Sequence, residues 1–163
     1  MSINSATQNN NPGNRPARVR IGELLITKGF ITEEDLATAL VEAKKSNQFV
    51  GQVLIRQGKL TREQLGSALS EQFNTKYVSL SKIEIDLPLL DILPEEFMRL
   101  KRVIPIGREA GRLVVAMIDP SDRSVIDEIT FITGMRPQAV ITTQIEFQET
   151  YNKYLSKIGR AHV

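Results

Sequence analysis

The fold of this chain is decided by two similar stretches, IGELLITKGFIT at residues 21–32 and VGQVLIRQGKLT at residues 50–61. The second stretch follows the first at a constant offset of 29 residues, and ten of the 22 aligned positions from Ile21 to Glu42 are identical. Similarity at a fixed period is the signature of an internal repeat. We therefore predict two copies of one structural unit between Arg20 and Gln72.

Each copy has the pattern of a helix-loop-helix. In the first copy, Gly29 is placed to end a helix in the left-handed conformation. Thr32 then acts as an N-cap with Asp35 at N3, and Ile31 and Leu36 form a hydrophobic staple. The second copy repeats these positions with Gly58, Thr61, Gln64, Leu60 and Leu65. One apolar helical face is expected at Leu36, Ala39, Leu40 and Ala43, and its equivalent at Leu65, Ala68, Leu69 and Gln72.

Gly22 and Gly51 are expected at the start of the first helix of each copy, where glycine costs about 1 kcal/mol against alanine. Two interpretations explain them. The favoured one is close packing of one repeat on the other. The alternative is a bare helix start, whose free N–H groups and positive dipole end let a phosphate or a base edge approach.

The composition excludes several classes of protein. With 163 residues, 41% hydrophobic and 25% charged, the chain has room for one or two small globular domains. No apolar run reaches the length of a membrane span and no signal peptide is present, so we expect a cytoplasmic location without direct membrane insertion. A net charge of +2 leaves no basic footprint for nucleic acid. The absence of cysteine excludes disulfides and thiolate metal sites.

The motifs of an enzyme are also missing. The segment from Gly107 to Gly111 is too short for a phosphate-binding loop and lacks its lysine, and the only histidine is His162 near the end. The acidic residues Asp119 and Asp122 are better explained by strand ending and helix capping than by a metal or acid-base pair. We therefore predict no catalytic residue, no metal site and no cofactor in this chain.

The rest of the chain divides into segments around the repeat. Residues 1–18 are a polar leader expected to be disordered, and residues 19–74 form the helical repeat. Residues 75–101 are expected to connect two domains, with a short strand at Tyr77–Leu80, a helix start at Pro94 and a hinge between Ser81 and Leu100. Residues 158–163 resemble a translated sequencing adapter, and we expect them not to be native.

Residues 102–157 alternate between strand and helix patterns. Strands are expected at residues 103–106 and 113–118, joined by a turn from Gly107 to Gly111, and at residues 139–141. A helix capped by Asp122 ends at Gly134, and Thr143 opens the last helix. The predicted fold class is α+β, with an all-α tandem helix-loop-helix repeat followed by a small two-layer α/β domain of β-β-α-β-α order.

The repeat resembles the tandem Arg-Leu-Gly motif of the MshEN-type domain, the N-terminal regulatory part of the type II secretion and type IV pilus assembly ATPases (the GspE/PilB family). The residues that carry the resemblance are Arg20, Ile21, Gly22, Leu25, Gly29, Leu36 and Leu40, and in the second copy Gly51, Leu54, Gly58, Leu65, Leu69 and Gln72.

The resemblance implies a regulatory, non-catalytic module that binds cyclic di-GMP and couples it to a motor. Its implied partners are its own downstream ATPase domain, which would use ATP and Mg²⁺, and inner-membrane platform or cytoplasmic adaptor proteins of the machine. We expect the chain to be truncated before that ATPase domain. The implied location is cytoplasmic, or peripheral at the inner membrane through partners.

The resemblance also implies roles for individual residues. Arg20 would engage a guanine and its phosphate, and Gln72 would offer an amide to a base edge. Gly22 and Gly51 would permit close backbone approach. Apolar walls against the purines would come from Ile21, Leu25, Val50 and Leu54, and the remaining residues of the expected site are Gly29, Leu40, Gly58 and Leu69.

The chain departs from the motif at two positions. Ala43 stands where the first copy would have its glutamine, and Phe49 is the second-copy equivalent of Arg20. Alanine offers no hydrogen bond to a base, whereas Phe49 fits either a purine stack or a core position. These departures support a rival hypothesis, a protein-protein docking module that has lost nucleotide binding.

Overall fold

The computed structural model describes the backbone of residues 17–155 and the side chains of residues 21–155. The chain divides into two compact units, Met1–Ala68 and Leu69–Val163. Most of the predicted leader and the adapter-like tail lie outside the described residues. The end of the predicted leader is corrected, because Ala17 and Arg18 already belong to the first described helix.

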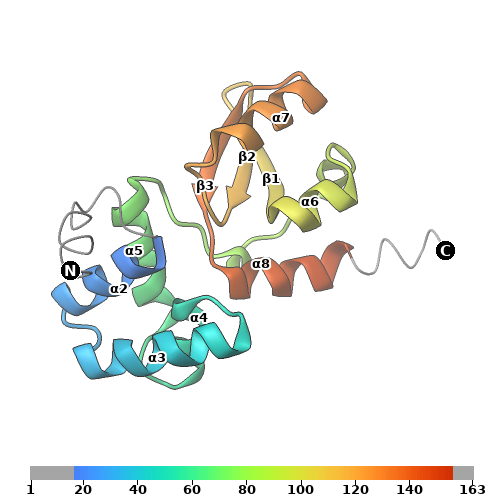
Figure 1. Ribbon diagram of the computed structural model, residues 1–163. Helices are drawn as coiled ribbons and strands as arrows, with labels where there is room; N and C mark the ends of the chain where they lie inside the picture. Colours follow the sequence, from blue (N-terminus) through green and yellow to red (C-terminus); the bar gives the residue numbers. More distant parts are fainter. Residues whose placement is uncertain (1–16, 156–163) are drawn as a thin grey trace, which may run out of the picture. The chain divides into compact units, whose positions relative to one another are not determined.

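The first unit is helical, as the repeat predicts (Figure 1). It contains the first-copy pair α2 (Ala17–Thr27) and α3 (Glu33–Ser46), then α4 (Val50–Arg56) and most of α5 (Arg62–Phe73). Between the copies, α3 continues through Ser46 and ends at Asn47, which adopts the left-handed conformation.

The turn inside each copy is a Schellman motif followed by a capping box. Gly29 and Gly58 have φ angles of 78° and 76°. The N–H of Phe30 donates to the Leu25 carbonyl at 3.0 Å, and the N–H of Lys59 donates to the Leu54 carbonyl at 2.9 Å. Hydroxyl caps follow in both copies, since Thr32 accepts from the Asp35 N–H and Thr61 accepts from the Gln64 N–H. The predicted helix punctuation is therefore confirmed in both copies.

The second unit contains a three-stranded sheet in the order β1-β2-β3. β1 and β2 are antiparallel, and β2 and β3 are parallel. Its elements are η2 (Leu80–Lys82), η3 (Leu87–Asp91), α6 (Glu95–Lys101), β1 (Val103–Glu109), β2 (Arg112–Met117), α7 (Arg123–Thr133), β3 (Pro137–Ile141), α8 (Gln144–Thr150) and η4 (Tyr151–Leu155).

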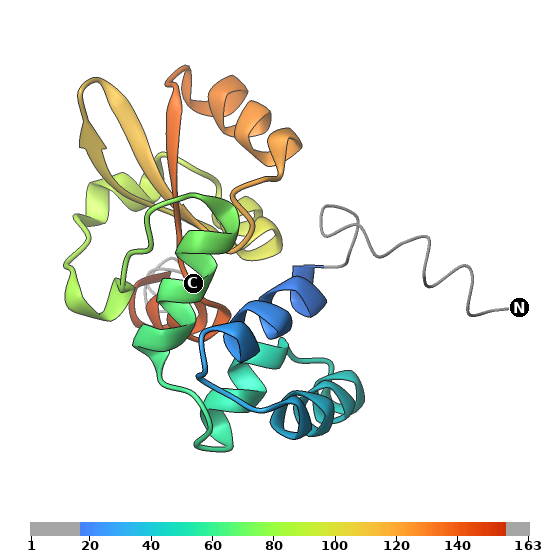
Figure 2. The same cartoon turned by 90° about the vertical axis from the view of Figure 1, so that its left-hand side faces the viewer.

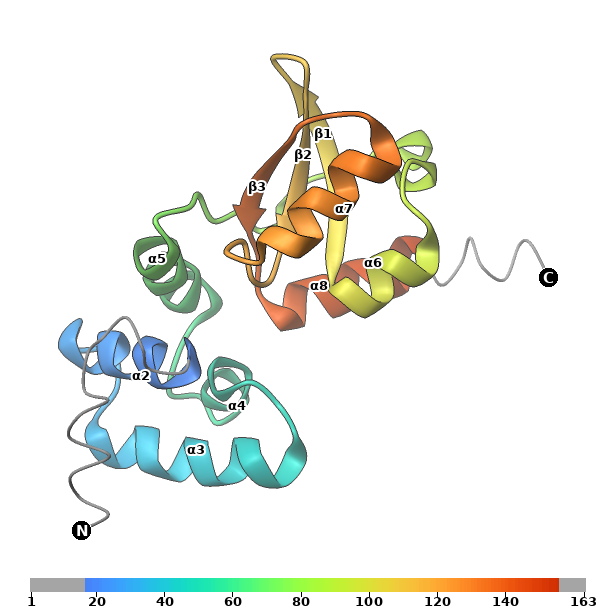
Figure 3. The same cartoon turned by 45° about the horizontal axis from the view of Figure 1, so that its top comes forward.

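The two faces of this sheet are covered differently. Leu113, Val115 and Met117 of β2 face a core shared with η3, α6, α7 and α8. Figures 2 and 3 show α7 lying over this face. On the opposite face, Ala116 packs with Val140 and Leu80, so the segment around η2 covers the side that α7 leaves open.

Residues 75–101 are corrected from a connecting segment to a part of the second unit. Ile85, Leu89, Leu90, Leu93 and Met98 are all buried in its core. The boundary between the units lies instead at Ala68. The predicted hinge between Ser81 and Leu100 therefore falls on residues that are packed into one unit.

Two predicted strand features also change. Gly107 belongs to β1, and the β1–β2 turn is the two-residue pair Ala110-Gly111, whose positive φ angles of 52° and 75° fit a type I′ turn. The predicted strand at Tyr77–Leu80 is a single bridge between Tyr77 and Ile141, followed by η2. The α+β class itself is confirmed.

A buried carboxylate fixes the start of the second unit to α8. Glu146 has no exposed surface. It accepts hydrogen bonds from the Tyr77 hydroxyl, from Ser79 Oγ at 2.7 Å and from the Ser81 N–H at 3.4 Å. Sequence reasoning missed this residue, because a glutamate in the first turn of a helix ordinarily indicates an exposed N-terminal position.

Within the described part of the chain, no helix combines the length and the apolar character needed to cross a membrane.

Candidate functional site

The repeated glycines are explained by packing inside each copy. A Cβ atom on Gly22 would lie 2.5 Å from Cδ1 of Leu36, and one on Gly51 would lie 2.8 Å from Cδ1 of Leu65. The favoured packing interpretation is thus corrected in one respect, since each glycine receives a leucine from the second helix of its own copy. Gly22 is also the sixth residue of α2 and not a helix start, whereas Gly51 is the second residue of α4.

The four predicted apolar walls lie in the core of the first unit. The exposed fractions are 5% for Ile21, 0% for Leu25, 1% for Val50 and 0% for Leu54. In this conformation they present almost no surface to a ligand. Their side chains belong to the core that holds the helices together.

The remaining predicted residues are more accessible. Gly29 and Gly58 are exposed at the two Schellman turns. Leu40, Leu69 and Gln72 are partly buried, and they lie one or two helical turns after the leucine that covers each glycine. The Arg20 side chain lies outside the described residues, although its backbone is part of α2.

The two departures from the motif occupy different environments. Ala43 is 1% exposed, so the first copy closes its helical face with a buried methyl group. Phe49 is 40% exposed and is the N-cap residue of α4, where it provides no side-chain cap. Its ring is therefore accessible from solvent.

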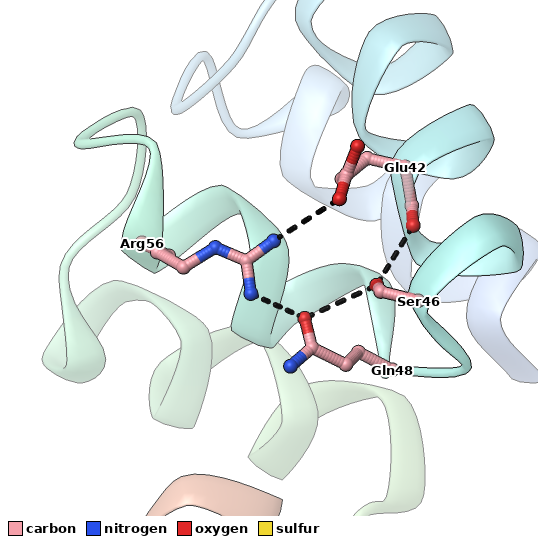
Figure 4. Close-up of polar contacts among 4 residues, drawn as sticks. All are labelled: Glu42, Ser46, Gln48 and Arg56. Atoms are coloured by element: carbon pink, nitrogen blue, oxygen red, sulfur yellow. Dashed lines mark hydrogen bonds and ion pairs between the residues drawn. The ribbon is translucent and has the colours of Figure 1, made fainter.

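A polar network joins the end of α3 to α4 (Figure 4). Arg56 donates to Gln48 Oε1 at 2.5 Å and lies 3.5 Å from the Glu42 carboxylate. Ser46 Oγ donates to the Glu42 carbonyl at 2.8 Å and to Gln48 Oε1 at 3.2 Å. The network links the first copy to the second, and sequence reasoning missed it. The sequence does contain a sign of this network, because the two copies differ here: Thr27 stands at the first-copy position that corresponds to Arg56.

A second ion pair joins the copies at the opposite end of α3. Lys59 Nζ lies 3.7 Å from the Asp35 carboxylate. The Thr32 N–H, which donates to Asp35 at 3.1 Å, is the main cause that lowers the pKa of Asp35 below its ordinary value, and the positive charge of Lys59 lowers this pKa further. The ionised Asp35 thus both caps α3 and attracts the second copy.

The described part of the first unit is a scaffold of paired helices. Between residues 17 and 155, no group of three histidine, cysteine or acidic side chains is placed to hold a metal ion. The arrangement that it does provide is two equivalent helix pairs with partly buried leucines and an accessible aromatic ring.

Comparison with protein families gives a match to the model described as MshEN domain, over residues 73–161. The matched region begins at the end of α5 and covers most of the second unit. The tandem repeat, to which sequence reasoning assigned the MshEN character, lies before it.

Two curated relatives extend the similarity over the repeat. The type IV pilus assembly ATPase PilB of Myxococcus xanthus is 27% identical over 140 residues, which cover 86% of this chain and 25% of that protein. PilB of Thermus thermophilus is 27% identical over 142 residues, which cover 86% of this chain and 16% of that protein. The chain thus spans a quarter or less of the length of these relatives.

Two solved structures resemble most of the chain. A structure of MshE with cdg is 29% identical in sequence and has a TM-score of 0.62. The match covers 83% of this chain and 98% of the MshE chain. The N-terminal domain of XpsE is 21% identical in sequence and has a TM-score of 0.58. The match covers 86% of this chain and 96% of the XpsE chain. The second likeness concerns the fold alone.

Proposed function

The chain belongs to the MshEN domain family, and we propose that it is an N-terminal regulatory region of a type IV pilus assembly or type II secretion ATPase. Its tandem repeat binds cyclic di-GMP, and binding is passed to a downstream ATPase domain. The chain itself carries no catalytic step. Its place of action is the cytoplasm, at the inner membrane when it is held there by platform or adaptor proteins.

The observation that carries this proposal is the duplicated glycine-leucine contact. Leu36 over Gly22 and Leu65 over Gly51 build the same local structure twice. Cyclic di-GMP has two equivalent guanine nucleotides, so two equivalent helix pairs can each meet one half of the ligand. The similarity to MshE with cdg supports this ligand over other symmetric dinucleotides.

The burial of the walls changes which residues contact the ligand. We assign direct contacts to Arg20, Leu40, Leu69 and Gln72, because an arginine can engage guanine and phosphate together and the other three residues are only partly buried. Phe49, with its exposed ring, takes the place of arginine in the second copy by stacking on a purine. The buried residues Ile21, Leu25, Val50 and Leu54 support these contacts without touching the base.

A docking module without nucleotide is the second candidate, and a specific observation favours it. The four expected wall residues are at most 5% exposed, and Ala43 removes one polar partner for a base. In that case the repeat serves as a rigid platform. Its exposed side chains, among them Val41 at 58%, would then contact protein.

Isothermal titration calorimetry of cyclic di-GMP into the full chain separates the two candidates. We expect saturable binding with one ligand per chain, and loss of about tenfold or more in affinity in Arg20→Ala, since a bidentate contact to a charged group is removed. Arg99→Ala is the matched control, because Arg99 is an exposed arginine on α6. Absence of heat at any workable concentration, or equal loss in both variants, contradicts nucleotide sensing.

A further inference from the structure

The last turn of α5 leads directly into a segment that packs on the sheet of the second unit. Asn74 adopts a left-handed φ of 48° directly after α5, and the Thr75 N–H closes the helix by donating to the Ser70 carbonyl at 3.1 Å. We call residues 74–82 the strap. Gln72, which we assign to the ligand, stands two positions before the strap, and all of these residues belong to the second unit.

The strap is attached to the sheet by its backbone and by an apolar side chain. The Ile141 N–H donates to the Lys76 carbonyl at 2.8 Å, and the Ile141 carbonyl accepts from the Val78 N–H at 2.9 Å. Leu80 is buried and packs against β2 and β3. The strap is therefore held against β3 and against the face of the sheet that α7 leaves open.

The strap is also attached to α8, through the buried carboxylate of Glu146. This carboxylate accepts from the Tyr77 hydroxyl, from Ser79 Oγ at 2.7 Å and from the Ser81 N–H at 3.4 Å. A buried carboxylate is costly unless it is hydrogen-bonded, and these three donors all come from the strap. The start of α8 is capped independently, because the Glu146 N–H donates to the Thr143 hydroxyl at 3.2 Å. The carboxylate therefore serves to join α8 to the strap.

The junction between β3 and α8 contains polar atoms that this conformation leaves unsatisfied. Among residues 21–155, the buried atoms Thr142 Oγ1 and Gln144 Oε1 have no hydrogen-bond partner. Unpaired buried polar groups are costly and are rare in native structures. A displacement of α8 that gave these atoms partners would be favourable, and the bonds from the strap to Glu146 oppose such a displacement.

We propose that the strap makes α8 responsive to the ligand: when cyclic di-GMP holds the end of α5 through Gln72, the strap restrains α8. This inference rests on the proposed function, since it takes Gln72 as a ligand contact. Coupling between separate sites is carried by hydrogen-bond networks and rigid elements, and a satisfied buried network makes its members rigid. α8 continues into η4, the last described element, so the restraint acts on the part of this unit that leads toward the proposed ATPase domain.

Amide hydrogen exchange of the full chain, with and without cyclic di-GMP, tests the proposal. We expect the ligand to slow exchange in the last turn of α5, in the strap and in α8 by about fivefold or more, the lower end of typical allosteric coupling. Tyr77→Phe with Ser79→Ala removes two of the three donors to Glu146. In this variant calorimetry should still show saturable binding, and the ligand should still slow exchange in α5. The ligand should change exchange in α8 by less than about twofold.

Tyr151→Phe is the matched control, because the Tyr151 hydroxyl donates to the Glu95 carboxylate at 2.7 Å, a tyrosine-glutamate hydrogen bond in the same unit but outside the strap. It should leave the response of α8 to the ligand unchanged. Ser79→Ala alone is the milder variant, for use if the double variant does not fold, and it should lose part of the response.

The outcomes separate this inference from the proposed function. If the unaltered chain binds no cyclic di-GMP, the proposed function fails and the inference fails with it. If the chain binds the ligand but exchange in α8 does not change, the role of the strap alone is overturned. The same conclusion follows if the strap variants keep the full response of α8, or if Tyr151→Phe loses as much of it as they do.

Discussion

Leu36 fills the space that a side chain on Gly22 would need, with its Cδ1 atom 2.5 Å from the ideal Cβ position. We therefore expect Gly22→Ala to lower the free energy of unfolding by about 1 kcal/mol, because overpacking costs about 1–3 kcal/mol and alanine regains roughly 1 kcal/mol of helix propensity. Urea denaturation measures the change. Gly51→Ala should behave alike, since Leu65 lies 2.8 Å from its Cβ position.

The control for this prediction is Gly107→Ala, where a Cβ atom meets open space. A double-mutant cycle between Gly22→Ala and Leu36→Ala should show a coupling of about 1 kcal/mol, because the clash exists only when both side chains are present. If Gly22→Ala instead stabilises the chain, close packing against Leu36 does not require a glycine at this position.

Gly29 and Gly58 are required for a different reason. Nothing lies within 4 Å of a Cβ atom on either residue, but their φ angles are 78° and 76°. Gly29→Ala and Gly58→Ala should each cost about 1 kcal/mol, as a left-handed conformation costs roughly 1–2 kcal/mol for residues with a side chain. Gly29→Asn should cost clearly less, as Asn47 adopts φ of 54° in the same unit. Thermal melts of the three variants decide the point, and equal losses for alanine and asparagine would contradict it.

The capping box of α3 should make stability depend on pH. The Thr32 N–H lowers the pKa of Asp35 in the folded chain. Because the pKa of Asp35 is lower in the folded chain than in the unfolded chain, the ionised carboxylate stabilises the fold fully when the pH is above the ordinary pKa of aspartate. This stabilisation is lost as the pH falls through the pKa that Asp35 has in the folded chain. Asp35→Asn should flatten this acid limb of a plot of unfolding free energy against pH. Denaturant titrations between neutral and acidic pH measure it, with Asp91→Asn, an exposed residue of η3, as the control.

Glu146 should be among the most sensitive residues of the second unit. Glu146→Ala leaves the donors of Tyr77, Ser79 and Ser81 without their acceptor, and we expect a loss of about 2–3 kcal/mol. Glu146→Gln keeps one carbonyl acceptor and should lose about half as much. Hydrogen exchange at residues 77–81 should rise in both variants before the sheet itself loses protection. Unchanged exchange there would show that this carboxylate does not hold the segment.

The local structure of the repeat could be predicted well, and the role of its residues less so. Thr32, Thr61, Gly29 and Gly58 act through backbone geometry within a few residues, so their functions follow from sequence spacing. The residue against which Gly22 packs could not be predicted in this way. The spacing of the repeat does not show whether the glycine contacts a helix of its own copy or a helix of the other copy.

The second unit shows the same limit. Asp122 and Gly134 are predictable as helix boundaries because capping is local. The segment at residues 75–101 has little regular periodicity, which is typical of a connector, yet Leu89, Leu90 and Leu93 are buried in the core of the second unit by contacts that sequence patterns do not record. The roles of Arg56 and Glu146 could not be predicted for the same reason, since their partners lie on other elements.

The bridge between Tyr77 and Ile141 connects an early segment of the second unit to its last strand, β3. The Val78 N–H donates to the Ile141 carbonyl at 2.9 Å. Everything between these two points is enclosed in one closed loop of backbone. A shortened chain that lacks Tyr77 would leave β3 without this partner, and one that lacks Ile141 would leave Tyr77 and Val78 without theirs. An engineered second unit should therefore include both segments.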